Sequence, residues 1–289
     1  MLNLNGFNKV GKSYFPDGSQ MLLDVDVKKI TAAPTDEQIF WQYEGDEECM
    51  TLYYLVKHLR ANRGEDVRIH LYMKYLPNAR MDRVKDTNKE VFTLKYFCEF
   101  INSLKFASVH VLDPHSDVGV ALLDRVVVDS IAHYVSYAVS WASQGQGKNS
   151  VIIFFPDAGA YKRYKDMPCI AENEKIYGQK VRNWETGKIE GLKVLDRDSV
   201  AIDSPTALEG KTVLMIDDII SYGGTLYYSA KQLKALGAEK IYAYATHTEN
   251  SVLDKEKGTF IKCLEDGTVE KLFTTESIFS GKHENIVVC

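Results

Sequence analysis

The apolar residues of this 289-residue chain alternate between two spacings, and this alternation restricts the folds open to it. Residues 67–71 are apolar at every second position, which predicts a strand. Residues 151–155 and 213–216 are apolar throughout, as in strands covered on both faces. Stripes at i, i+3, i+4 and i+7 predict helices between the strands. These stripes lie in 52–59, 97–104, 131–142 and 226–236, with further strands expected at 109–112 and 240–245. The repeated order predicts an α/β fold with largely parallel sheets flanked by helices.

Local signals suggest where two of these helices begin and end. Thr87 and Glu90 are spaced as a capping box that would start the second helix, and Gly237 would stop the helix over 226–236. The segment 143–150 is the most linker-like stretch, although it directly precedes a strand. We therefore place the domain boundary near Arg125, which predicts domains over 1–125 and 126–289.

Composition narrows the class of protein further. Hydrophobic residues make up 45% of the chain and charged residues 26%, which is typical of a folded globular protein. A net charge of −5 gives no field for holding nucleic acid. No apolar run approaches the roughly 18 residues of a membrane span, and the first fifteen residues lack a signal-peptide pattern. Five scattered cysteines without a CxxC pair indicate a reducing compartment, so we expect a cytoplasmic protein.

Polar side chains follow several of the predicted strands at the point where each strand ends. Arg80 and Asp82 lie in PNARMDR, His115 in DPHSD, and Asp157 in PDAG after the strand 151–155. Ligands of open parallel sheets bind beyond the carboxyl ends of the strands. We therefore expect these cations, carboxylates and the imidazole to gather on one rim.

The segment after the strand 213–216 carries the most informative pattern. Asp217 and Asp218 are followed by a Gly223-Gly224-Thr225 turn that would open a helix. Backbone N–H groups at a helix N-terminus bind anions, whereas paired carboxylates accept hydrogen bonds from vicinal hydroxyls and can hold hydrated Mg²⁺. The combination predicts a site for a sugar that carries a phosphate.

The stretch 212–247, TVLMIDDIISYGGTLYYSAKQLKALGAEKIYAYATH, resembles the phosphoribosyl-pyrophosphate motif of phosphoribosyltransferases. The rest of the chain resembles the ribose-phosphate pyrophosphokinase (phosphoribosyl pyrophosphate synthetase) family through FPDGS, YLPNARMDR, VHVLDPHSDVG and FFPDAG. The resemblance implies two tandem phosphoribosyltransferase-like domains. It also implies an enzyme that moves a diphosphoryl group from ATP to the anomeric hydroxyl of ribose 5-phosphate and releases AMP.

The family resemblance implies a role for each matching residue. The ATP side would comprise Phe15, Asp17, Arg80, Asp82 and His115, with Phe15 and Asp17 reaching into a neighbouring subunit's site of a dimer or hexamer. His115 and Asp157 would bind Mg²⁺, and Lys180 and Arg182 in YGQKVRNWE would be the catalytic cations of a mobile loop. The sugar-phosphate site would comprise Asp217, Asp218, Ser221, Tyr222, Gly223, Gly224 and Thr225. Two cations spaced i, i+2 on extended backbone project to the same side and can act as one clamp on a phosphoryl transition state.

The chain also departs from the family pattern, which leaves the acceptor open. Tyr222 stands where the family has a small residue in the phosphate loop, Met81 stands where it usually has Gln, and only fourteen residues precede Phe15. The resemblance therefore implies a divergent member of the family with a trimmed N-terminus. A bulkier acceptor such as ADP-ribose is therefore an alternative to ribose 5-phosphate. A catalytically silent partner of a synthetase and a true phosphoribosyltransferase are two others.

Overall fold

The computed structural model describes the chain except for residues 7, 24, 26–35, 85, 87–88 and 183–188, and it describes the backbone alone for the rest of 180–190. Two compact units divide the chain, Met1–Ser130 and Ile131–Cys289. The units divide after Ser130, close to the expected boundary near Arg125, because strand β8 (Val126–Asp129) pairs in parallel with β7 (Ser108–Leu112) and so belongs to the first unit.

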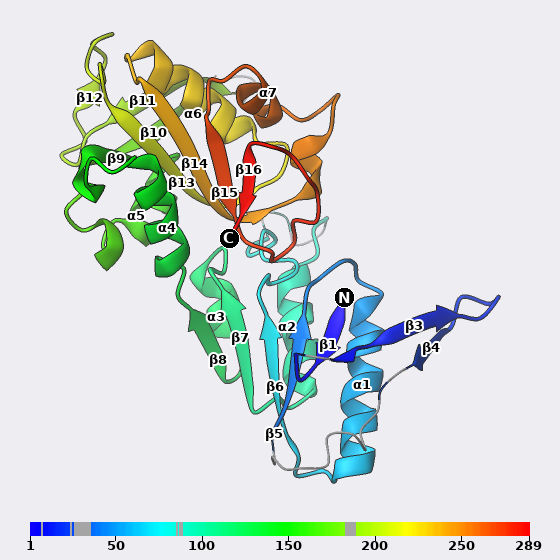
Figure 1. Ribbon diagram of the computed structural model, residues 1–289. Coiled ribbons are helices and arrows are strands. Elements are labelled where there is room, and N and C mark those ends of the chain that lie inside the picture. Colours follow the sequence, from blue (N-terminus) through cyan, green and yellow to red (C-terminus); the bar gives the residue numbers. More distant parts are fainter. Residues whose placement is uncertain (7, 24, 26–35, 85, 87–88, 183–188) are drawn as a thin grey trace. The chain divides into compact units, whose positions relative to one another are not determined.

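The first unit is built on a sheet with the order β2-β1-β5-β6-β7-β8 (Figure 1). Its strands β5 to β8 are parallel, and β1 and β2 extend it in the antiparallel sense. A separate hairpin, β3–β4, projects from the rest of the unit. The remaining bounds are β1 (Leu2–Leu4), β2 (Asn8–Lys9), β3 (Gly11–Tyr14), β4 (Gln20–Leu23), β5 (Asp36–Trp41), β6 (Arg68–Met73), α1 (Glu48–Arg63), α2 (Thr93–Ser103) and α3 (Asp117–Leu122).

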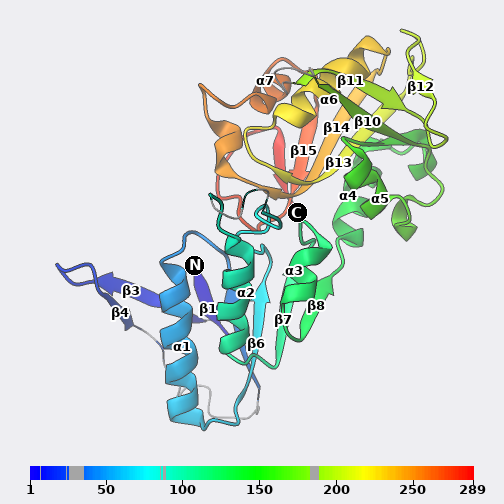
Figure 2. The ribbon, with the colours of Figure 1, turned by 180° about the vertical axis from the view of Figure 1, so that it is seen from behind.

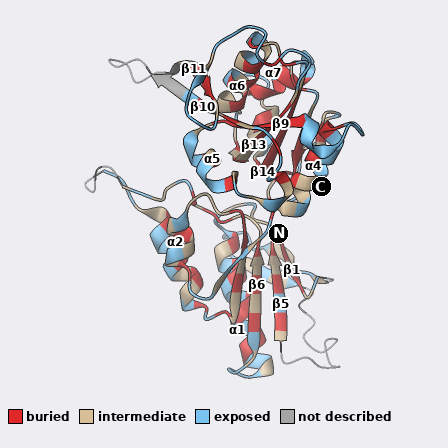
Figure 3. Ribbon diagram, turned by 90° about the vertical axis from the view of Figure 1, so that its left-hand side faces the viewer, coloured by how far each residue is buried: buried red, intermediate tan, exposed pale blue. Residues whose placement is uncertain are grey.

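The predicted apolar stripes form the core of this unit. The stripe of α1 consists of Leu52, Leu55, Val56 and Leu59, and all four side chains are completely buried. They pack with the apolar residues of α2 and of the strands in one cluster. In Figure 3, α1 and α2 are accordingly red along one side and pale blue along the other. The burial of one helix stripe against a sheet is the main stabilising contribution expected in such a layer.

The second unit contains a larger sheet with the order β12-β11-β10-β9-β13-β14-β15-β16. The strands from β10 through β9 to β16 run parallel, whereas β11 and β12 are antiparallel additions. The bounds are α4 (Ala132–Ala142), β9 (Val151–Phe155), α5 (Ala158–Tyr164), β10 (Lys175–Arg182), β11 (Ile189–Leu195), β12 (Ala201–Ile202), β13 (Thr212–Ile220), α6 (Gly224–Ala235), β14 (Lys240–Thr248), α7 (Phe260–Glu265), β15 (Lys271–Thr274) and β16 (Ile286–Val288). The largely parallel α/β architecture predicted from the spacing is confirmed.

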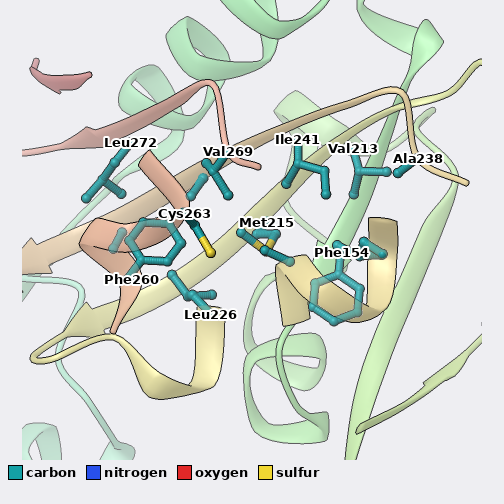
Figure 4. Close-up of a cluster of buried hydrophobic side chains, with 14 of the residues drawn as sticks. Phe154, Val213, Met215, Leu226, Ala238, Ile241, Phe260, Cys263, Val269 and Leu272 are labelled. Atoms are coloured by element: carbon teal, nitrogen blue, oxygen red, sulfur yellow. The ribbon is translucent and has the colours of Figure 1, made fainter. Parts of the chain in front are cut away.

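Helices cover both faces of this sheet (Figure 2). Leu226 of α6 and Phe260 of α7 pack in one cluster with Phe154, Val213 and Met215 of the central strands (Figure 4). Strand side chains alternate between faces, so the neighbours of these strand residues point the other way. On that opposite face the ring of Phe155 contacts Tyr161 of α5, and Tyr242 contacts Trp141 of α4. The central strands are therefore buried on both sides, as their continuous apolar sequences predicted.

Two details differ from the sequence expectations. Strand β13 continues to Ile220 instead of ending at Ile216, so Asp217 and Asp218 lie within it. Helix α2 begins at Thr93 with Phe92 at its N-cap, and no side chain caps it; the predicted capping-box start is wrong, and Thr87 lies outside the described residues. Residues 143–150 connect α4 to β9 inside the second unit, in agreement with a domain boundary placed outside this segment.

Candidate functional site

The paired carboxylates occupy the carboxyl end of β13 in the second unit. Asp218 is buried, with 8% of its surface exposed, and Asp217 is half-buried. The Asp217 carboxylate accepts a hydrogen bond of 3.0 Å from the Asp218 backbone N–H. Parallel pairing with β14, which continues to Ile220, fixes the position of this strand end. Both carboxylates therefore sit where ligands of parallel sheets bind.

The turn after β13 leads directly into helix α6. Gly223 is its N-cap and adopts the left-handed conformation, with φ at 83°, which glycine reaches without strain. No side chain caps α6, so the backbone N–H groups of its first turn are available to a ligand or to solvent. Ser221, Gly224 and Thr225 are half-buried around this turn, and Tyr222 is 40% exposed. The geometry is that of an anion site at a helix N-terminus.

Contacts from α7 hold this turn in place. The backbone N–H groups of Thr259 and Phe260 both donate to the carbonyl oxygen of Tyr222, at 2.9 and 3.2 Å. The Thr259 hydroxyl donates to the same oxygen at 2.9 Å. The Ser221 hydroxyl also lies 3.2 Å from that of Ser251. The turn is thus anchored through its backbone, while the ring of Tyr222 extends outward.

Asp157 belongs to the same region of the second unit, because it follows β9, the neighbour of β13. Its Oδ1 accepts hydrogen bonds from the backbone N–H groups of Gly159 and Ala160, at 3.0 and 3.1 Å, and so caps α5. Arg163, in the last turn of α5, places its Nη1 3.5 Å from Oδ2 of Asp218. Helix α5 therefore brings a carboxylate and a cation to the aspartate pair.

The carboxylates of this cluster act on each other electrostatically. Burial raises the pKa of Asp217 well above its ordinary value, and the negative charges of Asp218 and Asp157 raise it further. Like charges in a partly dry environment disfavour the ionised form of Asp217 in this way. A carboxylate that is perturbed by burial and by neighbouring charges is typical of functional sites.

The residues expected to bind ATP lie in two parts of the first unit: the loops after β6 and β7, and the turn of the β3–β4 hairpin. Arg80 and Asp82 follow β6, and His115 follows β7; these two loops are joined by a backbone hydrogen bond of 3.1 Å from Leu112 to Lys74. Arg80 is exposed, and Asp82 and His115 are half-buried. The strand order β6-β7 thus brings these three predicted residues to one edge of the sheet.

The structure places Phe15 and Asp17 apart from that edge, at the tip of the β3–β4 hairpin. Phe15 is 52% exposed, and its backbone closes the turn through hydrogen bonds with Gly18 and Ser19. The backbone and hydroxyl of Ser19 both donate to Asp17 Oδ1, at 2.9 and 2.6 Å. These hydrogen bonds lower the pKa of Asp17. The expected role of Phe15 in a neighbouring subunit stays a prediction.

The expected catalytic cations lie near the end of strand β10. The backbones of Lys180 and Arg182 pair with Leu192 and Ile189 of β11, so both residues belong to a hairpin. Their side chains lie outside the described part of the chain. The role of the two cations therefore stays a prediction from the resemblance.

The described residues contain no group of three or more His, Cys, Asp or Glu side chains that could hold a metal ion. Mg²⁺ needs no such cage, because it keeps several waters and is bound by one or two carboxylates together with substrate phosphates. The oxygen donors of Asp217 and Asp218 as a pair, or of Asp157 singly, fit that chemistry. His115 belongs to the first unit and Asp157 to the second, so their joint role as magnesium ligands stays a prediction.

A cavity of about 830 Å³ lies elsewhere in the second unit, beside α5 and the amino end of β10, and none of the predicted site residues lines it. Its lining mixes both signs of charge. Lys165 lies 3.3 Å from Asp166, and Arg197 lies 3.5 Å from Asp198, so the cations there have local acidic partners. Its charges select no particular ligand.

Sequence reasoning missed two residues of the site, Arg163 and Thr259. Arg163 had a weak signal, because a cation six residues after Asp157 lies on the helix that Asp157 opens. Thr259 had none, since it lies 37 residues from Tyr222 in the sequence. Contacts of this range follow from the packing of α7 and not from any local pattern.

The fold and the site of the second unit define a domain of the phosphoribosyltransferase type. The family model for the phosphoribosyl transferase domain matches residues 173–275, which include β13, the turn and α6. The whole chain also has relatives.

A ribose-phosphate pyrophosphokinase from Marinomonas sp. is 24% identical over 255 residues, which cover 88% of this chain and 71% of that protein. Ribose-phosphate pyrophosphokinase 2 from Enterococcus faecalis is 26% identical over 242 residues, or 84% of this chain and 68% of that protein. The crystal structure of phosphoribosylpyrophosphate synthetase from Mycobacterium smegmatis has the same fold, with a TM-score of 0.67 and 16% identity over 98% of this chain and 86% of that one. The predicted resemblance is confirmed: the chain is a relative of the ribose-phosphate pyrophosphokinases, which are transferase enzymes.

The structure adds one observation about membranes. No helix in the described ranges is both long enough and apolar enough to cross a bilayer.

Proposed function

We propose that this protein is a Mg²⁺-dependent diphosphotransferase that moves the β,γ-diphosphoryl group of ATP to the anomeric hydroxyl of a ribose 5-phosphate acceptor and releases AMP. The observation that carries the proposal is the site at the end of β13. There, two aspartates precede a glycine turn whose helix has no side-chain cap. The relatives named ribose-phosphate pyrophosphokinase support the same reaction.

Each part of this site suits one part of the acceptor. The carboxylates of Asp217 and Asp218 can accept hydrogen bonds from the vicinal hydroxyls of ribose. The first-turn N–H groups of α6, from Gly224 onward, and the hydroxyls of Ser221 and Thr225 can donate to the 5-phosphate. The acceptor would then be held at both ends with its anomeric hydroxyl free to react.

The reaction requires the protein mainly to position the two substrates and to stabilise negative charge. The anomeric hydroxyl loses its proton to solvent water as its oxygen bonds to the β-phosphorus. The bond between that phosphorus and the oxygen shared with the α-phosphorus breaks, and AMP leaves with this oxygen. Lys180 and Arg182 would neutralise charge on the phosphoryl oxygens, and Arg80 would hold the ATP phosphates. Bound Mg²⁺ would supply Lewis-acid polarisation of the phosphates. No side chain in the described site stands out as a general base.

One activity assay with the purified protein tests the proposal. The purified protein is supplied with MgCl₂, ATP and ribose 5-phosphate; AMP is followed by chromatography and the product by mass spectrometry. We expect AMP together with a product that is heavier than the acceptor by one diphosphate. The variant Asp217→Asn should lower kcat/KM by roughly tenfold to a hundredfold, because a carboxylate acceptor is lost. Asp203→Asn, an exposed aspartate of the same unit, is the matched control.

One observation favours ADP-ribose as a second candidate acceptor. The backbone of Tyr222 is fixed by Thr259 and Phe260, but its ring is 40% exposed beside the turn. A ring in that position can stack on a group attached to the phosphate. ADP-ribose in place of ribose 5-phosphate should then give AMP and the correspondingly heavier product, and Tyr222→Ala should weaken this acceptor more than ribose 5-phosphate.

The remaining alternatives predict other products. A phosphoribosyltransferase would release pyrophosphate without AMP when it is given phosphoribosyl pyrophosphate and a base other than adenine. A catalytically silent partner would produce no AMP with either acceptor, and that outcome would refute the proposal.

A further inference from the structure

The aspartate pair of the second unit has a cationic neighbour that the family motifs do not point out. Three carboxylates gather at this site: Asp157 at the start of α5, and Asp217 and Asp218 on β13. The pKa of Asp217 is raised first by burial and then by the negative charges of Asp218 and Asp157. A sugar phosphate that binds here adds further negative charge. A positively charged group near the aspartates would offset part of this repulsion.

Arg163 is placed to do so. Its Nη1 lies 3.5 Å from Oδ2 of Asp218; the arginine side chain is 29% exposed and that of Asp218 only 11%. The guanidinium carbon also lies 5.6 Å from the ring centre of Tyr164, a buried residue. The packing of α5 against β9 and β13 keeps this helix beside the aspartates. Arg163 as a residue is exposed, as Lys162 is, but its guanidinium faces the Asp218 carboxylate and the ring of Tyr164.

The two aspartates are consequently not equivalent. Asp218 is the more buried one and has an ion-pair partner, whereas Asp217 is half-buried and accepts a hydrogen bond from the backbone of Asp218. A buried carboxylate that loses its cation is strongly destabilised and turns away or recruits water. Removing Arg163 would therefore withdraw the cation that faces Oδ2 of Asp218 and leave more of the negative charge of the site uncompensated.

We propose that Arg163 is a positioning residue of the sugar site: its guanidinium holds the Asp218 carboxylate in one orientation and offsets part of the charge of the three aspartates. This inference rests on the proposed function, because it concerns how the same site receives a ribose phosphate. It assigns no bond-making step to Arg163.

The test compares Arg163→Met and Arg163→Lys with the wild type and with Lys162→Met, the exposed neighbouring cation on the same helix. The readouts are kcat, the separate KM values for ribose 5-phosphate and ATP, and the dissociation constant of ribose 5-phosphate by calorimetry in the presence of MgCl₂. We expect Arg163→Met to raise the KM and Kd for ribose 5-phosphate roughly tenfold or more. The KM for ATP should change by less than about twofold. Arg163→Lys should recover part of the loss, since it keeps the charge but not the planar fork. Lys162→Met should behave as wild type.

A double-mutant cycle separates positioning from a general structural role. If Arg163 acts through Asp218, Arg163→Met should have little further effect on the Kd in an Asp218→Asn background. An undiminished effect in that background, or equal changes in both KM values, would overturn the inference. If Arg163→Met fails to fold in a thermal melt, Arg163→Lys decides, and a Kd for ribose 5-phosphate equal to that of the wild type refutes the assignment.

The outcomes also distinguish this inference from the proposed function. AMP formation by the wild type with an unchanged Kd in Arg163→Met contradicts the inference alone. Absence of AMP from the wild type contradicts the diphosphotransferase proposal, while the calorimetric comparison still reports on Arg163. A wild-type protein that does not bind ribose 5-phosphate overturns both.

Discussion

The backbone of Gly223 lies directly against the side chain of Phe260. A Cβ atom on Gly223 would sit 2.2 Å from the Cβ of Phe260, a separation that real Cβ atoms do not reach. Phe260 is completely buried in the core of the second unit and cannot yield easily. The turn that opens α6 can therefore approach α7 only because residue 223 has no side chain. The position of the candidate phosphate site and the packing of the core are thus coupled through this contact.

Gly223→Ala should accordingly damage both the turn and the core. Its φ of 83° disfavours any side chain, and the clash with Phe260 adds to that cost. We expect a loss of stability of roughly 2–4 kcal/mol and a rise of at least about tenfold in the KM for the acceptor. Gly267→Ala is the matched control, because its φ is 73° but nothing lies within 4 Å of the added methyl. That variant should cost about 1 kcal/mol and leave the KM unchanged. Equal effects of the two variants in thermal melts and kinetics would show that the contact with Phe260 is unimportant.

Mixing inactive variants tests the expected sharing of the ATP site. Phe15 lies at the exposed tip of the β3–β4 hairpin, whereas His115 lies in the loop after β7. If the two residues serve one site from different subunits, Phe15→Ala and His115→Ala should each be impaired alone. Their co-expression should restore about a quarter of wild-type activity in a dimer, because half of the dimers are mixed and each contains one intact site. No recovery in verified mixed oligomers would mean that each subunit builds its own ATP site.

Glu48 should make the first unit sensitive to acid. It is completely buried, and its Oε2 accepts hydrogen bonds of 2.8 Å from Trp41 Nε1 and 3.0 Å from the Glu44 N–H. Burial alone would raise the pKa of Glu48, but hydrogen bonds from the terminal amine, Trp41 and Glu44 outweigh it and lower the pKa below its ordinary value. The stabilisation is therefore complete above the unfolded-state pKa of about 4.3 and is lost as the pH falls through the lower folded-state pKa.

The variant Glu48→Gln measures this contribution. We expect it to be less stable than the wild type at pH 7 by roughly 1–3 kcal/mol and to lose less further stability in acid. Urea denaturation between pH 3 and pH 7 gives the comparison, with the exposed neighbour Glu47→Gln as control. Parallel pH profiles for wild type and Glu48→Gln would show that another group governs the acid sensitivity.

The cysteines should be slow to react in the native protein. All five are free thiols and none is exposed. Burial raises the pKa of Cys98 and of Cys263 to about 11, and burial together with nearby acidic residues does the same for Cys49. At pH 8 such a thiol is ionised to only about one part in a thousand, and the thiolate is the reactive form. Mass spectrometry after iodoacetamide treatment should find these three residues unmodified in buffer but alkylated in urea. Rapid native labelling of any one would contradict its burial.

Much of the fold could be read from the spacing of apolar residues, because burial imposes a period on each element. The stripe of α1 is completely buried, and the continuously apolar β9 is covered on both faces, as expected. The same logic failed at the end of β13, since Asp217 and Asp218 interrupt the apolar pattern while the strand pairing continues to Ile220. Strand pairing depends on backbone hydrogen bonds to β14, which polar side chains do not prevent.

The sequence by itself determined the α/β class, the strands and helices with a clear apolar spacing, and the residues of the glycine turn with its aspartates. These depend on local spacing and on chemistry within one segment. Only the tertiary structure decided that Arg163 partners Asp218 and that Thr259 and Phe260 anchor the turn at Tyr222. These contacts join segments that are 37 to 55 residues apart in the chain. Their formation depends on how helices pack on a sheet, and a local sequence pattern contains no record of that packing.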